Sequence, residues 1–126
     1  MSRITEIEIA GRQYPLNFSV KAAKAVANRY GDISSVGEAF TDKSLDEMMD
    51  EATWLLALLM EQGAAYKKII DSEDVTVPTK DELEIIMGVA DFASIKDKLM
   101  DALLAGMKRE VEVEPDPKNA EATQGK

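Results

Sequence analysis

The N-terminal run RITEIEIAGRQYPLNFS, residues 3–19, constrains the fold most, because its apolar residues alternate with polar ones twice, on either side of a glycine. The alternating positions are Thr5, Ile7 and Ile9 before the break, and Tyr14, Leu16 and Phe18 after it. A period of two is typical of strands, and Gly11-Arg12 fits a two-residue turn with glycine first, so we predict a β-hairpin with Pro15 at an edge. Because an isolated hairpin is only marginally stable in water, helices or another subunit's strands must cover its apolar face.

After the hairpin the spacing of apolar residues becomes helical. Ser19 is the predicted N-cap of a helix that runs to Tyr30, after which Gly31 can adopt the left-handed conformation that ends a helix. The inward stripe of this helix is expected to consist of Val20, Ala23, Ala27 and Tyr30. A shorter pattern predicts a brief helix over residues 35–40.

A long helix is predicted to begin after Ser44, which forms a capping box with Glu47, and to run to about Gln62. After Gly63 the helical pattern continues to about Ile70. The expected inward stripe is Leu45, Met48, Ala52, Leu55 and Leu59. The second half of the helix is apolar on all sides, which is typical of a central core helix and, in the alternative interpretation, of a subunit or partner interface.

Two further helices are predicted in the C-terminal half. Thr79 and Glu82 form a second capping box before a short helix whose apolar residues are Leu83, Ile86, Met87 and Ala90. The last helix is capped by Asp91 or Ser94 and keeps apolar residues at helical spacing up to Arg109.

These patterns together predict an α+β fold that is mainly α, with an N-terminal β-hairpin followed by a bundle of about four to five helices. Residues 1–110 are expected to form a single globular domain, which is a length that can bury a sizeable core. Residues 111–126 contain two prolines and no periodic apolar face, so we predict a flexible, acidic C-terminal tail.

The composition excludes most catalytic chemistry. The chain has no cysteine and no histidine, so thiol nucleophiles, imidazole bases, Ser-His-Asp triads and thiolate or imidazole zinc sites are excluded. The formal net charge of -9 disfavours binding to nucleic acid or to anionic lipid. The longest apolar run, ATWLLALLM, is less than half of the roughly 20 residues that span a bilayer, and the N-terminus lacks the apolar stretch of a signal peptide. We therefore expect a non-enzymatic protein without a cofactor, a metal ion, a nucleic-acid partner or a membrane span.

Carboxylates remain the only abundant reactive groups. Asp46, Glu47, Asp50 and Glu51 give two pairs at i,i+4 spacing, which a solvated helix N-terminus explains better than a metal site without histidine does. The acidic loop at residues 71–82 resembles a calcium loop at its first, third and twelfth positions, but Thr76 replaces the glycine that the sixth position needs. A carboxylate-only, metal-dependent enzyme is therefore retained only as the least favoured alternative.

The order of elements resembles the tail assembly chaperones of long-tailed, siphovirus-type bacteriophages and prophages, especially those from Gram-positive hosts. The resemblance covers roughly residues 4–110 and is carried by the segments GRQYPLNFSVKAAKAVANRYGDISS, ATWLLALLMEQGAAY, VPTKDELEIIMG and IKDKLMDALLAGMKREVE. It implies a chaperone that binds the tape-measure protein and helps to recruit tail-tube subunits during tail morphogenesis. Such a protein acts in the cytoplasm of the bacterial host and is absent from the mature virion.

A chaperone of this kind needs an apolar surface and a solubilising acidic exterior, and it needs no reactive side chains. The predicted partner-binding residues are Trp54, Leu55, Leu58, Leu59 and Met60, for which the competing interpretation is core packing. Adaptable contacts are also expected from Met48, Met49, Met60, Met87, Met100 and Met107. The alternative function is an acidic protein-binding inhibitor that mimics nucleic-acid charge. An exposed hairpin edge and an apolar helix would also permit a homo-oligomer.

Overall fold

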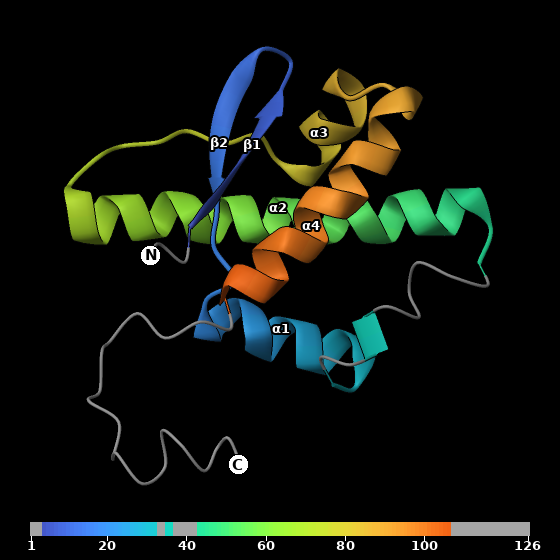
Figure 1. The fold of residues 1–126 in the computed structure, drawn as a ribbon, viewed down its shortest axis with the longest axis horizontal. Helices are drawn as coiled ribbons and strands as arrows, with labels where there is room; N and C mark the ends of the chain where they lie inside the picture. Colours follow the sequence, from blue (N-terminus) through green and yellow to red (C-terminus); the bar gives the residue numbers. More distant parts are fainter. Residues whose placement is uncertain (1–3, 33–34, 37–42, 107–126) are drawn as a thin grey trace, which may run out of the picture.

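The computed structural model describes residues 4–32, 35–36 and 43–106, in which an N-terminal β-hairpin is followed by helices (Figure 1). Strand β1 spans Thr5–Ile9 and pairs antiparallel with strand β2, Arg12–Leu16. The predicted α+β, mainly α fold class is therefore confirmed. The predicted tail at residues 111–126 and most of the predicted helix at residues 35–40 lie outside the described residues.

The turn of the hairpin lies one residue earlier than the sequence pattern suggested. Ile9 pairs with Arg12, so the loop consists of Ala10 and Gly11 and not of Gly11 and Arg12. Both loop residues have positive φ, at 53° and 81°, which is the signature of a type I′ turn. This turn matches the right-handed twist of the strands, and glycine satisfies its second position while Ala10 adopts the left-handed conformation at the first.

Helix α1 spans Val20–Tyr30, and its predicted cap is confirmed because the Ser19 hydroxyl accepts a hydrogen bond from the Ala22 amide at 3.0 Å. The predicted inward stripe is wrong in its first member. The side chain of Val20 is 75% exposed, whereas Ala22 and Val26 are fully buried. The Ser19 hydroxyl also donates to Gln62 Oε1 on the next helix, and this bond helps to fix how the first turn of α1 meets the rest of the domain.

Helix α2 is a single helix over Leu45–Asp71, with the predicted Ser44–Glu47 capping box at its start. Gly63 lies within this helix and does not interrupt it. The glycine lets strand β2 come close to α2, because a Cβ at this position would overlap the carbonyl oxygen of Pro15. The predicted inward stripe of α2 is wrong in its first member, because Leu45 is 53% exposed.

The C-terminal half consists of helix α3 at Lys80–Ile86, a single 3₁₀ turn η2 at Val89–Asp91, and helix α4 at Phe92–Gly106. The Thr79–Glu82 capping box is confirmed, and Leu83 is fully buried. The short helix ends earlier than the apolar spacing predicted, because the chain becomes extended at Met87.

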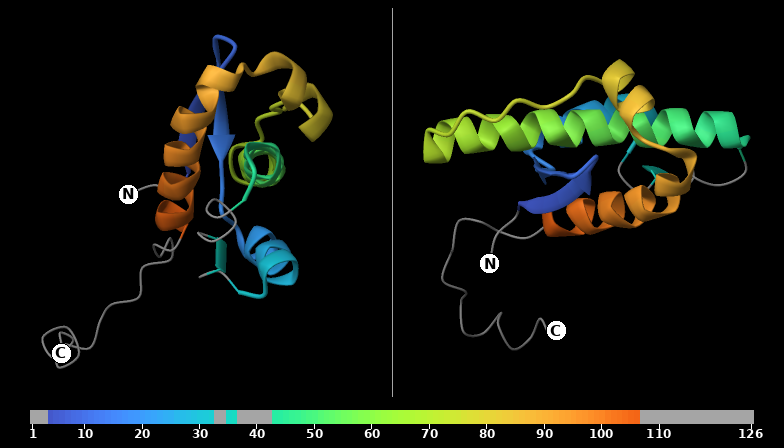
Figure 2. Two further views of the ribbon diagram at one scale, coloured as in Figure 1. Left: turned by 90° about the vertical axis from the view of Figure 1, so that its right-hand side faces the viewer. Right: turned by 90° about the horizontal axis from the view of Figure 1, so that it is seen from above.

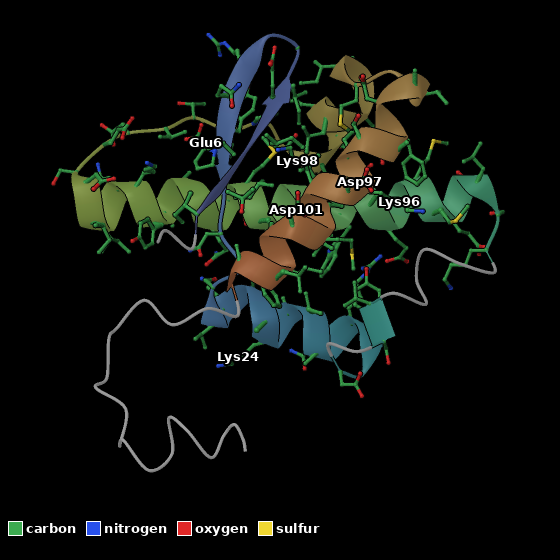
Figure 3. All side chains as sticks on the ribbon, in the orientation of Figure 1. Glu6, Lys24, Lys96, Asp97, Lys98 and Asp101 are labelled. Atoms are coloured by element: carbon green, nitrogen blue, oxygen red, sulfur yellow. The ribbon has the colours of Figure 1, made fainter. Side chains whose placement is uncertain are left out.

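The hairpin lies between α2 and α4, with β2 against α2 and β1 beside α4 (Figure 2). The Asn17 amide donates to the Leu59 carbonyl at 3.1 Å, which joins the end of the hairpin to the middle of α2. On α4, Asp97, Lys98 and Asp101 are exposed (Figure 3). The largest fully buried side chains are Leu16, Val26, Val36, Leu55, Leu56, Leu59, Met60, Leu83 and Leu99. Within the described part of the chain, no helix combines the length and apolar content needed to cross a bilayer.

Candidate functional site

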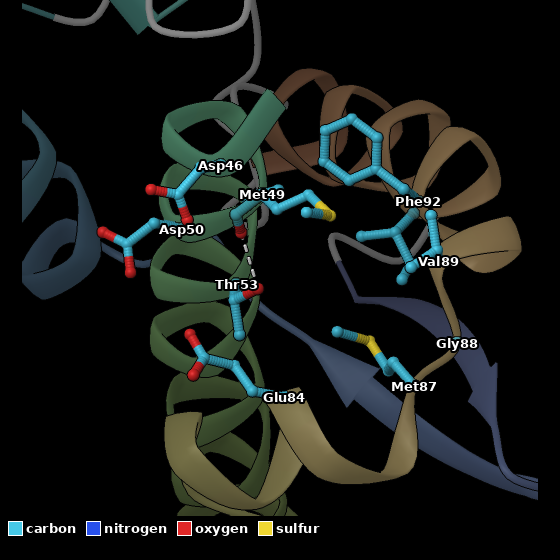
Figure 4. A pocket seen from close by; sticks show the side chains of 11 residues that line it. Asp46, Met49, Asp50, Thr53, Glu84, Met87, Gly88, Val89 and Phe92 are labelled. Carbon is cyan, nitrogen blue, oxygen red and sulfur yellow. Dashed lines mark hydrogen bonds between the residues drawn. The ribbon is translucent and has the colours of Figure 1, made fainter. Parts of the chain in front are cut away.

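A groove lies between the first half of α2, the end of α3 with η2, and the start of α4 (Figure 4). We call it the α2–α4 groove; its volume is about 390 Å³. Its lining residues are Asp46, Met49, Asp50, Ala52, Thr53, Glu84, Met87, Gly88, Val89, Phe92 and Ile95. Among these residues Ala52 and Ile95 are buried. The side chains of Met49, Met87, Val89 and Phe92 surround the space between the elements (Figure 4). A hollow of this size with apolar walls can accept apolar side chains of a ligand.

The break between α3 and η2 creates one wall of this groove. Met87 has extended backbone angles, φ -91° and ψ 142°, and Gly88 follows it. The Gly88 amide donates to the Asp91 carboxylate at 2.9 Å, so the side chain of Asp91 stabilises the turn that contains it. As a result, Met87 and Val89 line the groove although a continued α-helix would have placed them differently. Val89 remains 71% exposed.

The margin of the groove formed by α2 and α3 carries three carboxylates, those of Asp46, Asp50 and Glu84. Lys80 Nζ lies 2.6 Å from Asp50 Oδ1 and 3.0 Å from Glu84 Oε2. Hydrogen bonding to Asp50, and then to Glu84, raises the pKa of Lys80 above its ordinary value, so this side chain is a cation at neutral pH. The arrangement therefore combines apolar walls with a carboxylate margin on one side only.

A second cluster, which we call the α1–α2 clasp, holds α1 against α2. Glu51 Oε1 accepts hydrogen bonds from Arg29 Nε at 2.9 Å and from the Tyr30 hydroxyl at 2.6 Å. The Arg29 guanidinium lies 4.3 Å from the centre of the Trp54 ring, and the Tyr30 ring meets Trp54 edge to face at 5.9 Å. These contacts join a charge pair, a cation–π contact and an aromatic pair around one tryptophan.

The clasp shifts the ionisation of its own members. Burial would by itself raise the pKa of the Glu51 carboxyl, but the hydrogen bonds from Arg29 and Tyr30 outweigh burial and hold this pKa below its ordinary value. Burial, followed by the hydrogen bond to Glu51, raises the pKa of the Tyr30 hydroxyl. Glu51 is therefore an ionised partner of Arg29 and Tyr30, and its side chain is partly buried and not part of a solvated helix face as the sequence pattern predicted.

Two of the five predicted partner-binding residues reach the surface. Leu55, Leu59 and Met60 are fully buried in the core, so the folded domain leaves them no surface for a partner. Trp54 and Leu58 are partly buried and line a smaller hollow of about 280 Å³, together with residues 77–80. The sequence pattern found the helix but did not separate its core face from its accessible face.

The α2–α4 groove itself contains two of the methionines that were expected to make adaptable contacts, Met49 and Met87. Val89, Phe92 and the carboxylate margin were not predicted as a site. The one available signal was the Met87-Gly88 pair, which interrupts a helical pattern, but only the tertiary fold brings it opposite α2.

Within the described ranges, no group of three or more acidic side chains is arranged to hold a metal ion. No protein-family model, no curated protein and no solved structure matches this chain.

Proposed function

We propose that this protein is a tail assembly chaperone that binds the tape-measure protein and helps to recruit tail-tube subunits during phage tail morphogenesis. The observation that carries the proposal is the α2–α4 groove, an open hollow of about 390 Å³ with apolar walls and a carboxylate margin. A protein that acts by binding another chain needs such a surface and needs no reactive group.

The walls of the groove suit a helical client. An amphipathic helix presents apolar side chains at i, i+3, i+4 and i+7, and these can enter a groove between helices. Methionine is unbranched and polarisable, so Met49 and Met87 can adjust to client side chains of different shape. This adaptability suits a chaperone that contacts a long helical client at more than one place.

The element order that resembles tail assembly chaperones supports the same function. In this proposal the protein acts in the cytoplasm of the bacterial host, leaves before the virion is complete, and binds its client without a cofactor. The proposal predicts that its gene lies between a tail-tube gene and a very long tape-measure gene. Neighbouring genes of metabolic enzymes would contradict it.

The direct test is binding between the purified chain and the tape-measure protein encoded beside it, measured by pull-down and by titration calorimetry. Val89→Asp places a charge in a groove wall at a position that is already 71% exposed, so the fold should tolerate it. We expect this variant to weaken binding at least about tenfold, because the new carboxylate must be desolvated by an apolar client surface.

Ile69→Asp is the matched control, because Ile69 is 77% exposed near the far end of α2 and does not line the groove. The control variant should bind the client as the wild-type chain does. If the wild-type chain binds neither the tape-measure protein nor the tail-tube protein, the proposed function is wrong. If Val89→Asp binds as tightly as wild type, the groove is not the binding site.

A further inference from the structure

Lys80 occupies a position at the margin of the α2–α4 groove that a cation from another protein could also use. Its ammonium nitrogen lies 2.6 Å from a carboxylate oxygen of Asp50 on α2 and 3.0 Å from a carboxylate oxygen of Glu84 on α3, its own helix. Both carboxylates line the groove, and the Lys80 side chain is one-third exposed. In the described part of the chain, Lys80 is the cation that pairs with Asp50 and Glu84, and the margin carries a third carboxylate, that of Asp46.

The spacing of the acids on α2 favours a helical partner. Asp46 and Asp50 are four residues apart, so they lie one turn apart on the same side of α2. A helix that lies along α2 with two basic residues one turn apart can match both carboxylates, while its adjacent apolar face enters the groove. A second copy of this chain is a poorer match, because its net charge is -9.

We infer that the groove selects a client segment that is an amphipathic helix with lysine or arginine along one edge, and that Lys80 competes with those residues for Asp50 and Glu84. This inference deepens the proposed function, on which it rests, by giving the chemistry of the bound segment. Lys80 then sets the affinity of the groove: it weakens binding of every cationic helix and so leaves the client contact reversible.

The test uses two fluorescein-labelled synthetic peptides with leucine at the same i, i+3, i+4 and i+7 positions. One carries lysine along the edge of its apolar face, and the other carries glutamate there. Fluorescence anisotropy with the full-length chain should show binding of the lysine peptide and at least about tenfold weaker binding of the glutamate peptide. Affinity for the lysine peptide should fall as NaCl rises from about 0.05 M to about 0.5 M, since exposed charge pairs are screened by salt.

Two variants test the role of Lys80. Lys80→Met should raise the affinity for the lysine peptide about two- to fivefold, the range expected for one partly exposed ion pair, and Asp50→Asn should lower it by a similar factor. Lys68→Met is the matched control, because Lys68 pairs with Asp74 at 2.7 Å and neither residue lines the groove. Circular dichroism of each variant checks that the fold is retained.

Each result decides one question. Equal binding of the two peptides, or an unchanged affinity in Lys80→Met, would overturn this inference even if the tape-measure protein binds. Absence of binding by both peptides would also overturn it. A dimer seen by light scattering that the lysine peptide dissociates would assign the groove to a second copy and overturn the inference. Failure of the proposed function is seen separately, in the binding assay with the tape-measure protein.

Discussion

Gly63 shows how the absence of one side chain sets the distance between a strand and a helix. It lies within α2, where glycine is unfavourable by itself, and a Cβ there would overlap the Pro15 carbonyl of β2. We expect Gly63→Ala to lower the free energy of unfolding by about 1–3 kcal/mol, because overpacking outweighs the gain in helix propensity. Urea denaturation followed by circular dichroism measures this loss.

Gly88→Ala is the control for that substitution. Gly88 has φ -92°, and the nearest atom to an added Cβ is Asp91 Oδ2 at 3.7 Å, which is ordinary contact. Its free energy of unfolding should stay within about 0.5 kcal/mol of wild type. If Gly63→Ala were equally neutral, the close approach of β2 to α2 would not be required for stability.

Helix α1 is attached to α2 in part by a carboxylate whose ionisation depends on pH. The folded-state pKa of Glu51 lies below its ordinary value of 4.5, so its contribution to stability is present above that value and is lost as the pH falls through the folded pKa. Glu51→Gln should therefore lower stability at pH 7, by about 1 kcal/mol for a partly exposed charged hydrogen bond. Urea denaturation at a series of pH values measures this difference.

The same series distinguishes this clasp from the other carboxylates. The difference between wild type and Glu51→Gln should shrink as the pH falls below about 4.5, because protonated Glu51 no longer pairs with Arg29 as an anion. Asp74→Asn removes an exposed ion pair with Lys68 and should change stability little at any pH. A difference for Glu51→Gln that stays constant down to the lowest pH would show that the charge of Glu51 is not what holds α1.

The charge of the whole chain has its own effect on stability. A net charge of -9 makes the folded state repel itself, and salt screens this repulsion. Raising NaCl from about 0.02 M to about 0.15 M should therefore raise Tm by about 1–3 °C, although the same salt weakens the surface ion pairs. Differential scanning calorimetry measures the shift, and an unchanged or lower Tm would mean that the ion pairs outweigh the repulsion.

The sequence predicted what depends on neighbours along the chain and missed what depends on tertiary contacts. The capping boxes at Ser44 and Thr79 are local hydrogen-bond patterns, and both were found. The alternation of the hairpin was also found, but turn position depends on which residues pair, and this placed Ala10 in the loop. The exposed Val20 shows the same limit, because apolar spacing does not say which face of a helix meets its neighbour.

The candidate site was the least predictable part for the same physical reason. The α2–α4 groove combines α2, the extended residue Met87 and the start of α4, which are distant in sequence. Methionine content indicated adaptable contacts at Met49 and Met87. Lys80 and Glu84 are four residues apart on one helix, whereas nothing local indicated that Asp50 would share Lys80 with Glu84. Asp46 and Asp50, which were predicted only as part of a solvated helix start, line the margin of the groove.

The position of the hairpin between α2 and α4 has a consequence for how the chain is made. β1 is synthesised early, yet its neighbour α4 leaves the ribosome on the order of ten seconds later at ordinary elongation rates. Until α2 has emerged the nascent hairpin lacks both helical neighbours, and after that it still lacks α4, so the isoleucines of β1 remain open to water or to other chains. Folding of the domain can therefore finish only after α4 has emerged. An mRNA truncated before the codons of α4 would yield an aggregation-prone product.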